Sequence, residues 1–132
     1  MYNRTMKRWI VLLICLILLY SLLVKIQGAW FYPALGMATW YDPHGTASGE
    51  TYQEGQFTCA MRKRGFGKNY LVCNLENNKC VEVRHTDFGP TLYHFVRGKV
   101  IDLSRNAFAE IADLDKGVIR VRIGEIYPAQ VD

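Results

Sequence analysis

Hydrophobic and polar residues follow two different patterns along the 132-residue chain. Near the N-terminus, basic residues precede a nearly unbroken apolar run over residues 9–24, which ends at Lys25. Further along, apolar and polar residues alternate over short stretches, as they do in strands with one buried face. In "VIRVRI", for example, Ile119, Val121 and Ile123 fall on one side. We therefore expect an N-terminal helix followed by a strand-rich part.

Several short strands and few helices are predicted in the second part. The predicted strands are "GMATWYD", "YLVCNL", "CVEVRHTD", "KVIDL" and "VIRVRI", whereas the composition of "PHGTASGE" favours a loop. "RNAFAEIA" is predicted to be a short helix with Ser104 as its N-cap, and Gly117 lies past its end. Many short strands with one or two short helices favour a compact barrel over a sandwich.

The N-terminal pattern is typical of an export signal or an uncleaved membrane anchor. The apolar run is a little short for a span of about 20 residues, and "IQGA" matches a cleavage site only loosely, so both alternatives stay open. We expect residues 1–29 to be this signal or anchor, with residues 9–24 able to contact the membrane. Residues 30–132 are then one domain in the periplasm or outside the cell. No lipobox surrounds Cys15, so we expect no lipidation.

The net charge of +4 does not indicate nucleic-acid binding. Four basic residues and no acid lie in the first 29 residues, and removing these four from the 16 basic residues leaves 12 bases against 12 acids. The charge therefore belongs to the targeting segment.

Three cysteines remain outside this segment, and export permits disulfides. Cys73 and Cys80 flank a turn at Asn77-Asn78, so a hairpin brings them onto facing strands within disulfide range. Cys59 is either free or competes for one of these partners. The three cysteines and His85 match no common zinc spacing, and we expect neither a metal nor a cofactor.

The stretches "GMATWYD", "TASGETY", "NLENNKC", "TDFGP" and "VIDLSRNAF" occur in an order that resembles the rare lipoprotein A family and the first domain of expansins. The resemblance covers roughly residues 35–124 and implies a mainly β fold, a six-stranded double-psi β-barrel. Rare lipoprotein A proteins include lytic transglycosylases that cut peptidoglycan glycan strands, whereas expansins loosen wall polysaccharide without clear hydrolysis. Both act outside the cell.

The resemblance also implies a groove built from four residues. These are Asp87 of "TDFGP", Asp102 of "VIDLS", Thr39 of "MATWY" and Glu50 of "SGE". It implies acid/base catalysis by Asp87, with Asp102 and Glu50 tuning it or orienting substrate and Thr39 donating a hydrogen bond. A lytic enzyme needs a proton for the leaving oxygen, and the C6 hydroxyl of the sugar then closes a 1,6-anhydro ring.

This chain departs from the family pattern at two positions. Met61 stands where the family has a catalytic histidine, and Phe88 replaces the arginine after the motif aspartate. By the period-two rule Val81, Val83, His85 and Asp87 share a face, so His85 can supply a catalytic histidine from another position. The alternative is a partly exposed histidine bonded to backbone.

Other residues allow both a functional and a structural interpretation. Aspartates before Gly-Pro often form turns by accepting bonds from backbone amides. Trp40, Tyr41, Phe88 and Tyr93 can stack on sugars or fill the core. The "RKR" sequence at residues 62–64 can attract an anionic wall polymer or form a solvated loop.

Two functions follow from these observations. The first is a peptidoglycan lytic transglycosylase, and the second is a non-catalytic, expansin-like module that binds or loosens cell-wall polysaccharide. Both take glycan strands as partner, and we expect a monomer. Loss of the family histidine favours the second, whereas Asp87, Asp102 and Glu50 together favour the first.

Overall fold

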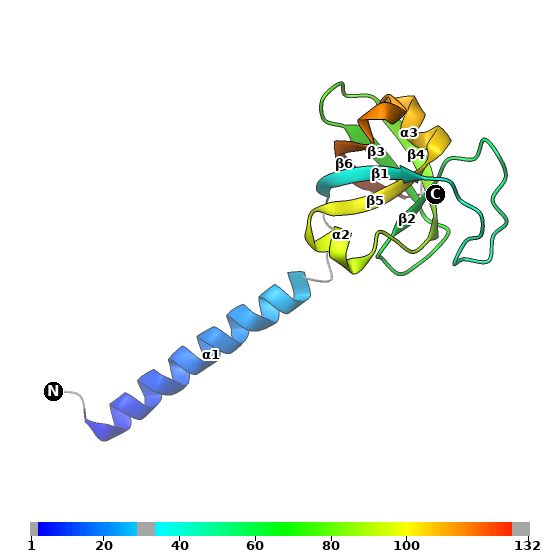
Figure 1. Ribbon diagram of the computed structural model, residues 1–132. Helices are drawn as coiled ribbons and strands as arrows, with labels where there is room; N and C mark the ends of the chain where they lie inside the picture. The colour runs from blue at the N-terminus through cyan, green and yellow to red at the C-terminus, as the bar shows by residue number, and fades with distance from the viewer. Residues whose placement is uncertain (1–2, 29–33, 128–132) are drawn as a thin grey trace, which may run out of the picture. The chain divides into compact units, whose positions relative to one another are not determined.

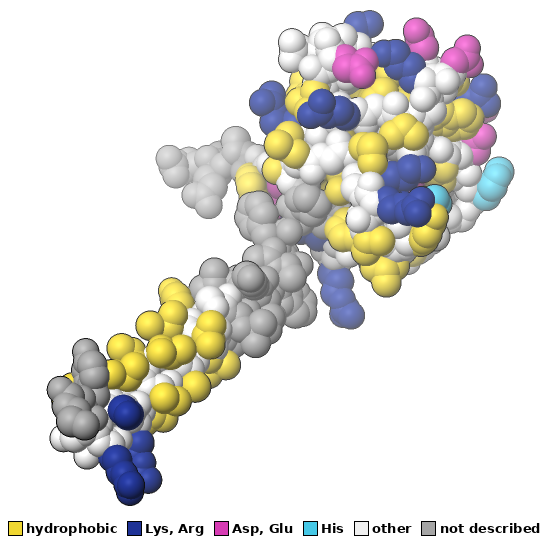
Figure 2. All heavy atoms as spheres, turned by 60° about the vertical axis from the view of Figure 1, so that its left-hand side comes forward, with side chains coloured by type: hydrophobic (Ala, Val, Ile, Leu, Met, Phe, Trp, Pro, Cys, Tyr) yellow, Lys and Arg dark blue, Asp and Glu magenta, His cyan; other side chains and the backbone are white. Residues whose placement is uncertain are grey.

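The computed structural model describes residues 3–28 and 34–127, and the chain divides into two compact units, residues 1–32 and 33–132. In the first unit, α1 (Arg4–Gly28) is one continuous helix. Its described side chains are largely apolar and exposed, with basic side chains at the N-terminal end (Figure 2). No helix within the described ranges combines the length and apolar character that a membrane crossing needs. The role of α1 as signal or anchor stays a prediction.

Six strands of the second unit close into a barrel (Figure 1). They are β1 (Leu35–Tyr41), β2 (Thr58–Met61), β3 (Asn69–Asn74), β4 (Cys80–Asp87), β5 (Lys99–Ser104) and β6 (Val118–Ile126). Their order around the barrel is β1-β5-β2-β4-β3-β6, with parallel pairing in β1–β5 and β2–β4. The mainly β, six-stranded barrel that the resemblance implies is confirmed.

Alternating residues supply the barrel core, and short helices add to it. Ile119, Val121 and Ile123 of β6 are buried, as their spacing predicts. The helical elements are α2 (Leu92–Val96), α3 (Arg105–Ile111) and the 3-10 turn η1 (Leu114–Lys116). Of these, α3 buries Phe108 and Ile111. Burial of these apolar side chains is the main source of stability in a domain of this size.

Two local features differ from the sequence predictions. β2 was not among the predicted strands, because all four of its residues are buried and no alternation marks it. Ser104 does occupy the N-cap position of α3, yet its side chain makes no capping bond. Its hydroxyl instead donates to the Gln56 carbonyl and accepts from the Thr58 amide, each at 3.1 Å. Ser104 thus holds the start of β2 against β5.

The hairpin between β3 and β4 carries the predicted disulfide. Asn78 has a φ of 59°, a left-handed conformation that asparagine tolerates in tight turns. Cys73 and Cys80 pair in the strand register and form the disulfide, whereas Cys59 is buried and free.

Removing this crosslink should destabilise the barrel. A disulfide over a short loop contributes roughly 2 kcal/mol, largely by restricting the unfolded chain. We expect the Cys73→Ala/Cys80→Ala double variant to lose about 2 kcal/mol of unfolding free energy in a denaturant titration. A reducing agent should produce the same loss in the wild type and none in the variant. Equal stability of both proteins under oxidising conditions would contradict this expectation.

Candidate active site

The two predicted acids flank one residue of β2. Ala60 is the register partner of Asp87 in β4 and of Asp102 in β5, and Asp102 is also the partner of Thr39 in β1. Residues directly opposite each other in neighbouring strands project to the same face. With a strand spacing of about 4.8 Å, the Cα atoms of the two aspartates lie about 10 Å apart. The register therefore gathers Thr39, Asp102 and Asp87 on one face, which we call the groove face.

A shift in the pairing of β2 with β4 places Asp87 there. Cys59 pairs with His85 and the next residue, Ala60, pairs with Asp87, so the register skips Thr86. Such a bulge re-aims the side chains that follow it. Strict alternation would have left Asp87 on the face of His85. The prediction that His85 and Asp87 share a face is therefore wrong.

His85 lies on the interior side of β4. It is fully buried, and its Nε2 lies 3.3 Å from the Met61 carbonyl oxygen and 3.0 Å from that of Asp87. The ring packs against Phe66 at a centroid distance of 5.1 Å. Burial lowers the pKa of His85. The contacts with backbone carbonyls match the alternative of a histidine bonded to backbone. The side chain is, however, buried rather than partly exposed. A catalytic role for His85 stays a prediction.

Asp102 sits in a close-packed part of the groove face. The Thr39 hydroxyl donates a hydrogen bond to its Oδ1, which is the kind of bond expected of Thr39. A Cβ atom at Gly89 would lie 3.1 Å from Asp102 Oδ2 and 3.2 Å from the Ala60 Cβ. The turn that follows Asp87 therefore packs directly on Asp102, and glycine permits this close approach.

The surroundings of Asp102 favour its protonated form. Burial raises the pKa of the Asp102 carboxyl, while the Thr39 hydrogen bond and the charges of Lys99 and His94 oppose that rise. The sequence analysis missed Lys99 and His94. Their nearness to Asp102 along the chain is the only signal that could have indicated them.

Backbone donors hold Asp87 in place. Its Oδ1 accepts from the Phe88 amide at 2.8 Å and from the Ala47 amide at 3.1 Å. The Ser48 amide donates to the Thr86 carbonyl at 2.9 Å, so the loop after β1 is fastened to the end of β4. Asp87 thus makes the hydrogen bonds to backbone amides that the structural interpretation of a turn-forming aspartate predicts. The same bonds fix the direction of its carboxylate.

Tyr41 lies near both acids. Burial raises the pKa of Tyr41, and Asp87, Cys59 and Asp102 raise it further by electrostatic repulsion of the phenolate. Its hydroxyl is itself buried and lies close to Thr58. The Tyr41 side chain therefore lies close enough to both Asp87 and Asp102 to feel their charges.

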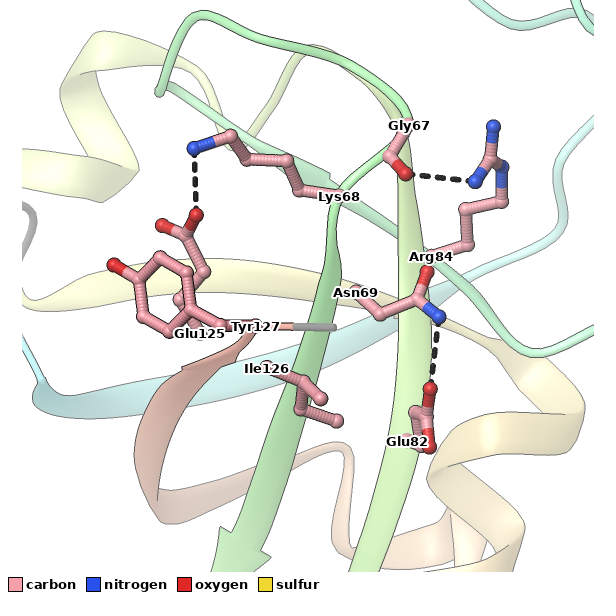
Figure 3. A pocket seen from close by; sticks show the side chains of 8 residues that line it. All are labelled: Gly67, Lys68, Asn69, Glu82, Arg84, Glu125, Ile126 and Tyr127. Atoms are coloured by element: carbon pink, nitrogen blue, oxygen red, sulfur yellow. Dashed lines mark hydrogen bonds and ion pairs between the residues drawn. The ribbon is translucent and has the colours of Figure 1, made fainter. Parts of the chain in front are cut away.

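Glu50 belongs to the same face but to a different environment. It forms a two-pronged ion pair with Arg84, in which Nε and Nη2 each lie 3.0 Å from a carboxylate oxygen. Hydrogen bonding by Arg84 holds the pKa of Glu50 below its ordinary value. Arg84 also donates to the Gly67 carbonyl at 2.7 Å, beside a pocket of about 540 Å³ (Figure 3). An exposed carboxylate paired in this way is suited to binding substrate rather than donating a proton.

The aromatic residues divide between surface and interior. Phe88 and Tyr93 are exposed, whereas Trp40 is half-buried and donates from its indole nitrogen to the Leu114 carbonyl at 3.1 Å.

Over the described part of the chain, no group of three or more His, Cys, Asp or Glu side chains is arranged to hold a metal.

Comparisons with known proteins identify the family of the chain. A family model described as lytic transglycolase matches residues 34–123. "Endolytic peptidoglycan transglycosylase RlpA" of Campylobacter jejuni is 36% identical over 110 residues, covering 74% of this chain and 38% of that protein. The protein of the same name from Pasteurella multocida is 40% identical over 96 residues, covering 70% of this chain and 31% of the relative. The chain thus spans about a third of the length of these curated relatives.

Solved structures show the same fold. An expansin of Clavibacter michiganensis superposes with a TM-score of 0.57 at 19% identity, covering 73% of this chain and 52% of the expansin. The Streptomyces papain inhibitor superposes with a TM-score of 0.53 at 25% identity, covering 67% of this chain and 90% of the inhibitor. The barrel thus has the double-psi β-barrel fold that expansin also has, and the chain belongs to the lytic transglycolase family, among the relatives of rare lipoprotein A.

Proposed function

We propose that this barrel is a lytic transglycosylase that cleaves peptidoglycan glycan strands to 1,6-anhydro ends. The observation that carries the proposal is the placement of Asp87 and Asp102 on either side of Ala60, on one face of the barrel. The relatives named as endolytic peptidoglycan transglycosylases indicate the substrate class.

The two aspartates can divide the proton transfers between them. As the bond from C1 to the leaving oxygen breaks, Asp102 gives its proton to that oxygen. The C6 hydroxyl oxygen then bonds to C1, and Asp87 takes the hydroxyl proton. Two carboxyls in unlike environments suit such a division, because burial raises the pKa of Asp102 while backbone amides orient Asp87. The sequence hypothesis gave both transfers to Asp87, and the burial of Asp102 supports the divided scheme instead.

The neighbouring side chains act through this pair or on the substrate. Thr39 positions Asp102 by its hydrogen bond, and Tyr41 lies near both acids. Glu50 and Arg84 present paired charges that can bind sugar hydroxyls further along the groove face. The divided scheme needs no proton transfer from His85, whose ring is buried on the interior side of β4.

The reaction places the protein outside the cytoplasm. We infer that residues 1–29 direct export, because basic residues precede an apolar helix there. Retention of this segment would attach the barrel to the membrane surface, whereas cleavage would release it into the periplasm or the exterior.

An expansin-like function without cleavage is the second candidate. Met61 occupies the place of the family histidine and is fully buried, so it supplies no proton carrier to the groove face. A groove of this kind would bind glycan and leave it intact. Product analysis separates the two functions, because only the enzyme releases anhydro-ended fragments.

Replacing either acid should abolish cleavage. We expect Asp87→Asn and Asp102→Asn each to lower the rate of anhydro-product release by at least about 100-fold, since each removes one proton transfer. The rate is measured by mass spectrometry of products from purified glycan strands. Asp115→Asn, on the exposed turn η1, is the matched control and should keep the wild-type rate. A wild-type rate in either groove variant would contradict the divided scheme.

The raised pKa of Asp102 also predicts how stability depends on pH. A carboxyl whose pKa is higher in the folded protein contributes stability that is fully present below its unfolded pKa of about 3.9. This contribution is lost as the pH rises through the folded pKa. The Asp102→Asn variant does not lose this stability as the pH rises, because its side-chain amide does not ionise. We therefore expect the melting temperature of Asp102→Asn, relative to wild type, to increase from pH 3 to pH 7.

Calorimetric scans of both proteins across this range measure the difference, with Asp115→Asn as the control for loss of an acidic side chain. A difference that does not change with pH would contradict the assignment of a raised pKa to Asp102.

A further inference from the structure

A pocket next to the ion pair of Glu50 with Arg84 takes no part in the proton transfers (Figure 3). It measures about 540 Å³, and the described residues that line it come from β4, β3 and β6 and from the loop that precedes β3. Arg84 belongs both to the ion pair and to the lining of the pocket. We call it the distal pocket, because it begins at Arg84 and not at the acid pair.

The strand register places the distal pocket on the same face of the barrel as the acids. Arg84 of β4 pairs with Asn69 of β3, which in turn pairs with Ile126 of β6, so the three side chains form a row across the sheet. The bulge at Thr86 turns Asp87 to the side of β4 that also carries the exposed Arg84. Three residues of extended chain span about 10 Å. A chain-like ligand that lies over Asp87 can therefore reach the pocket along one face.

The charged side chains of the distal pocket balance one another. Those that the structure describes are Lys68, Glu82, Arg84 and Glu125, two bases and two acids. Lys68 forms an ion pair with Glu125. Arg84 forms its ion pair with Glu50. Equal numbers of opposite charges give little net attraction for an anion or a cation, but they offer hydrogen bonds to hydroxyl groups. The lining therefore favours an uncharged polar ligand.

Asn69 contributes a hydrogen-bonding group without a partner. Its Nδ2 donates to Glu82 at 2.8 Å, but its buried Oδ1 accepts no hydrogen bond from any residue that the structure describes. A buried acceptor without a donor costs free energy, which a ligand donor would recover. Because the terminal torsion of asparagine is soft, a modest rotation turns this oxygen toward the pocket. The N–H of an acetamido group or the hydroxyl of a sugar is a suitable donor.

Tyr127 adds an aromatic surface to the distal pocket. Its side chain belongs to the lining and is 74% exposed. An aromatic face can stack on the apolar face of a sugar ring while the phenol stays in water. An exposed ring, balanced charges and an amide oxygen without a donor together fit a sugar that carries an acetamido group. The volume falls within the range of small-ligand pockets.

We propose that the distal pocket binds N-acetylglucosamine, the uncharged sugar of the glycan strand, a few sugars away from the bond that is cleaved. This inference rests on the proposed function, which places a glycan strand over Asp87 and Asp102. The other sugar of the strand, N-acetylmuramic acid, carries a lactyl group whose free carboxylate finds no excess of positive charge among the described lining residues. The pocket thus holds the strand at a second point, and the enzyme gains affinity for strands that are long enough to reach it.

The test uses peptide-free glycan fragments of two lengths, a tetrasaccharide and an octasaccharide, as substrates of the full chain. The wild type should have the lower KM for the octasaccharide. Asn69→Ala should raise the KM for the octasaccharide about fivefold, as expected for the loss of one hydrogen bond, and leave kcat unchanged. The KM for the tetrasaccharide should not change. Tyr127→Ala should give the same pattern, and because this ring is exposed, it decides the outcome if Asn69→Ala does not fold.

Asn106→Ala is the matched control. Asn106 is another half-buried asparagine, on α3, and its replacement should leave both KM values unchanged. α3 packs at the end of β3 far from Asn69, where Asn74 Nδ2 donates to the Ile111 carbonyl at 2.8 Å. A KM that rises equally for both fragments in Asn69→Ala and Tyr127→Ala, or for neither fragment, would overturn the proposal. Equal KM values of the wild type for the two lengths would overturn it as well.

A binding measurement keeps this test separate from the proposed function. If the wild type cleaves neither fragment, the proposed function fails, and NMR spectra of the full chain with added N-acetylglucosamine tetramer still test the pocket. Chemical shifts that move at the Asn69 side-chain amide and the Gly67 backbone amide, and stay fixed at Asn106, support a sugar site. Unchanged shifts at Asn69, or an equal response to N-acetylmuramic acid, overturn it.

Discussion

The bulge at Thr86 is the constraint on which the site depends. It advances the register of β4 by one residue against β2, so that Asp87 and not Thr86 lies opposite Ala60. Without this shift Asp87 would turn toward the interior with His85, and Asp102 would have no second carboxyl near it. Bulges commonly re-aim side chains next to active sites, and here the effect is to create an acid pair.

Packing around the pair then makes the two carboxyls unlike each other. Gly89 brings the backbone of the turn against Asp102, and burial raises the pKa of that carboxyl. Asp87, at the beginning of the same turn, receives backbone amides from its own turn and from the loop after β1. One short turn therefore buries one acid and orients the other. Such an asymmetry allows an acid and a base to work side by side near neutral pH.

Sequence patterns predicted the elements whose residues alternate, and missed those in which alternation fails. The faces of β6 and the pairing of Cys73 with Cys80 follow from spacing and turn chemistry. β2 is buried on both faces, so its four residues carry no period. The bulge breaks the period between His85 and Asp87, and nothing in "VEVRHTD" marks it. The resemblance to rare lipoprotein A indicated Asp87, Asp102, Thr39 and Glu50, but the arginine that binds Glu50 and the glycine that packs on Asp102 depend on tertiary contacts.

The central claim is that Asp87 and Asp102 lie on one face of the barrel, with Tyr41 near both. Tyr41 can report this directly, because its side chain lies near both carboxyls. NMR spectra compare the Tyr41 ring resonances of the wild type with those of Asp87→Asn and Asp102→Asn at one pH. Each substitution should shift these resonances. Tyr41 resonances that stay unchanged in both variants would contradict the account, because the two acids would then lie apart.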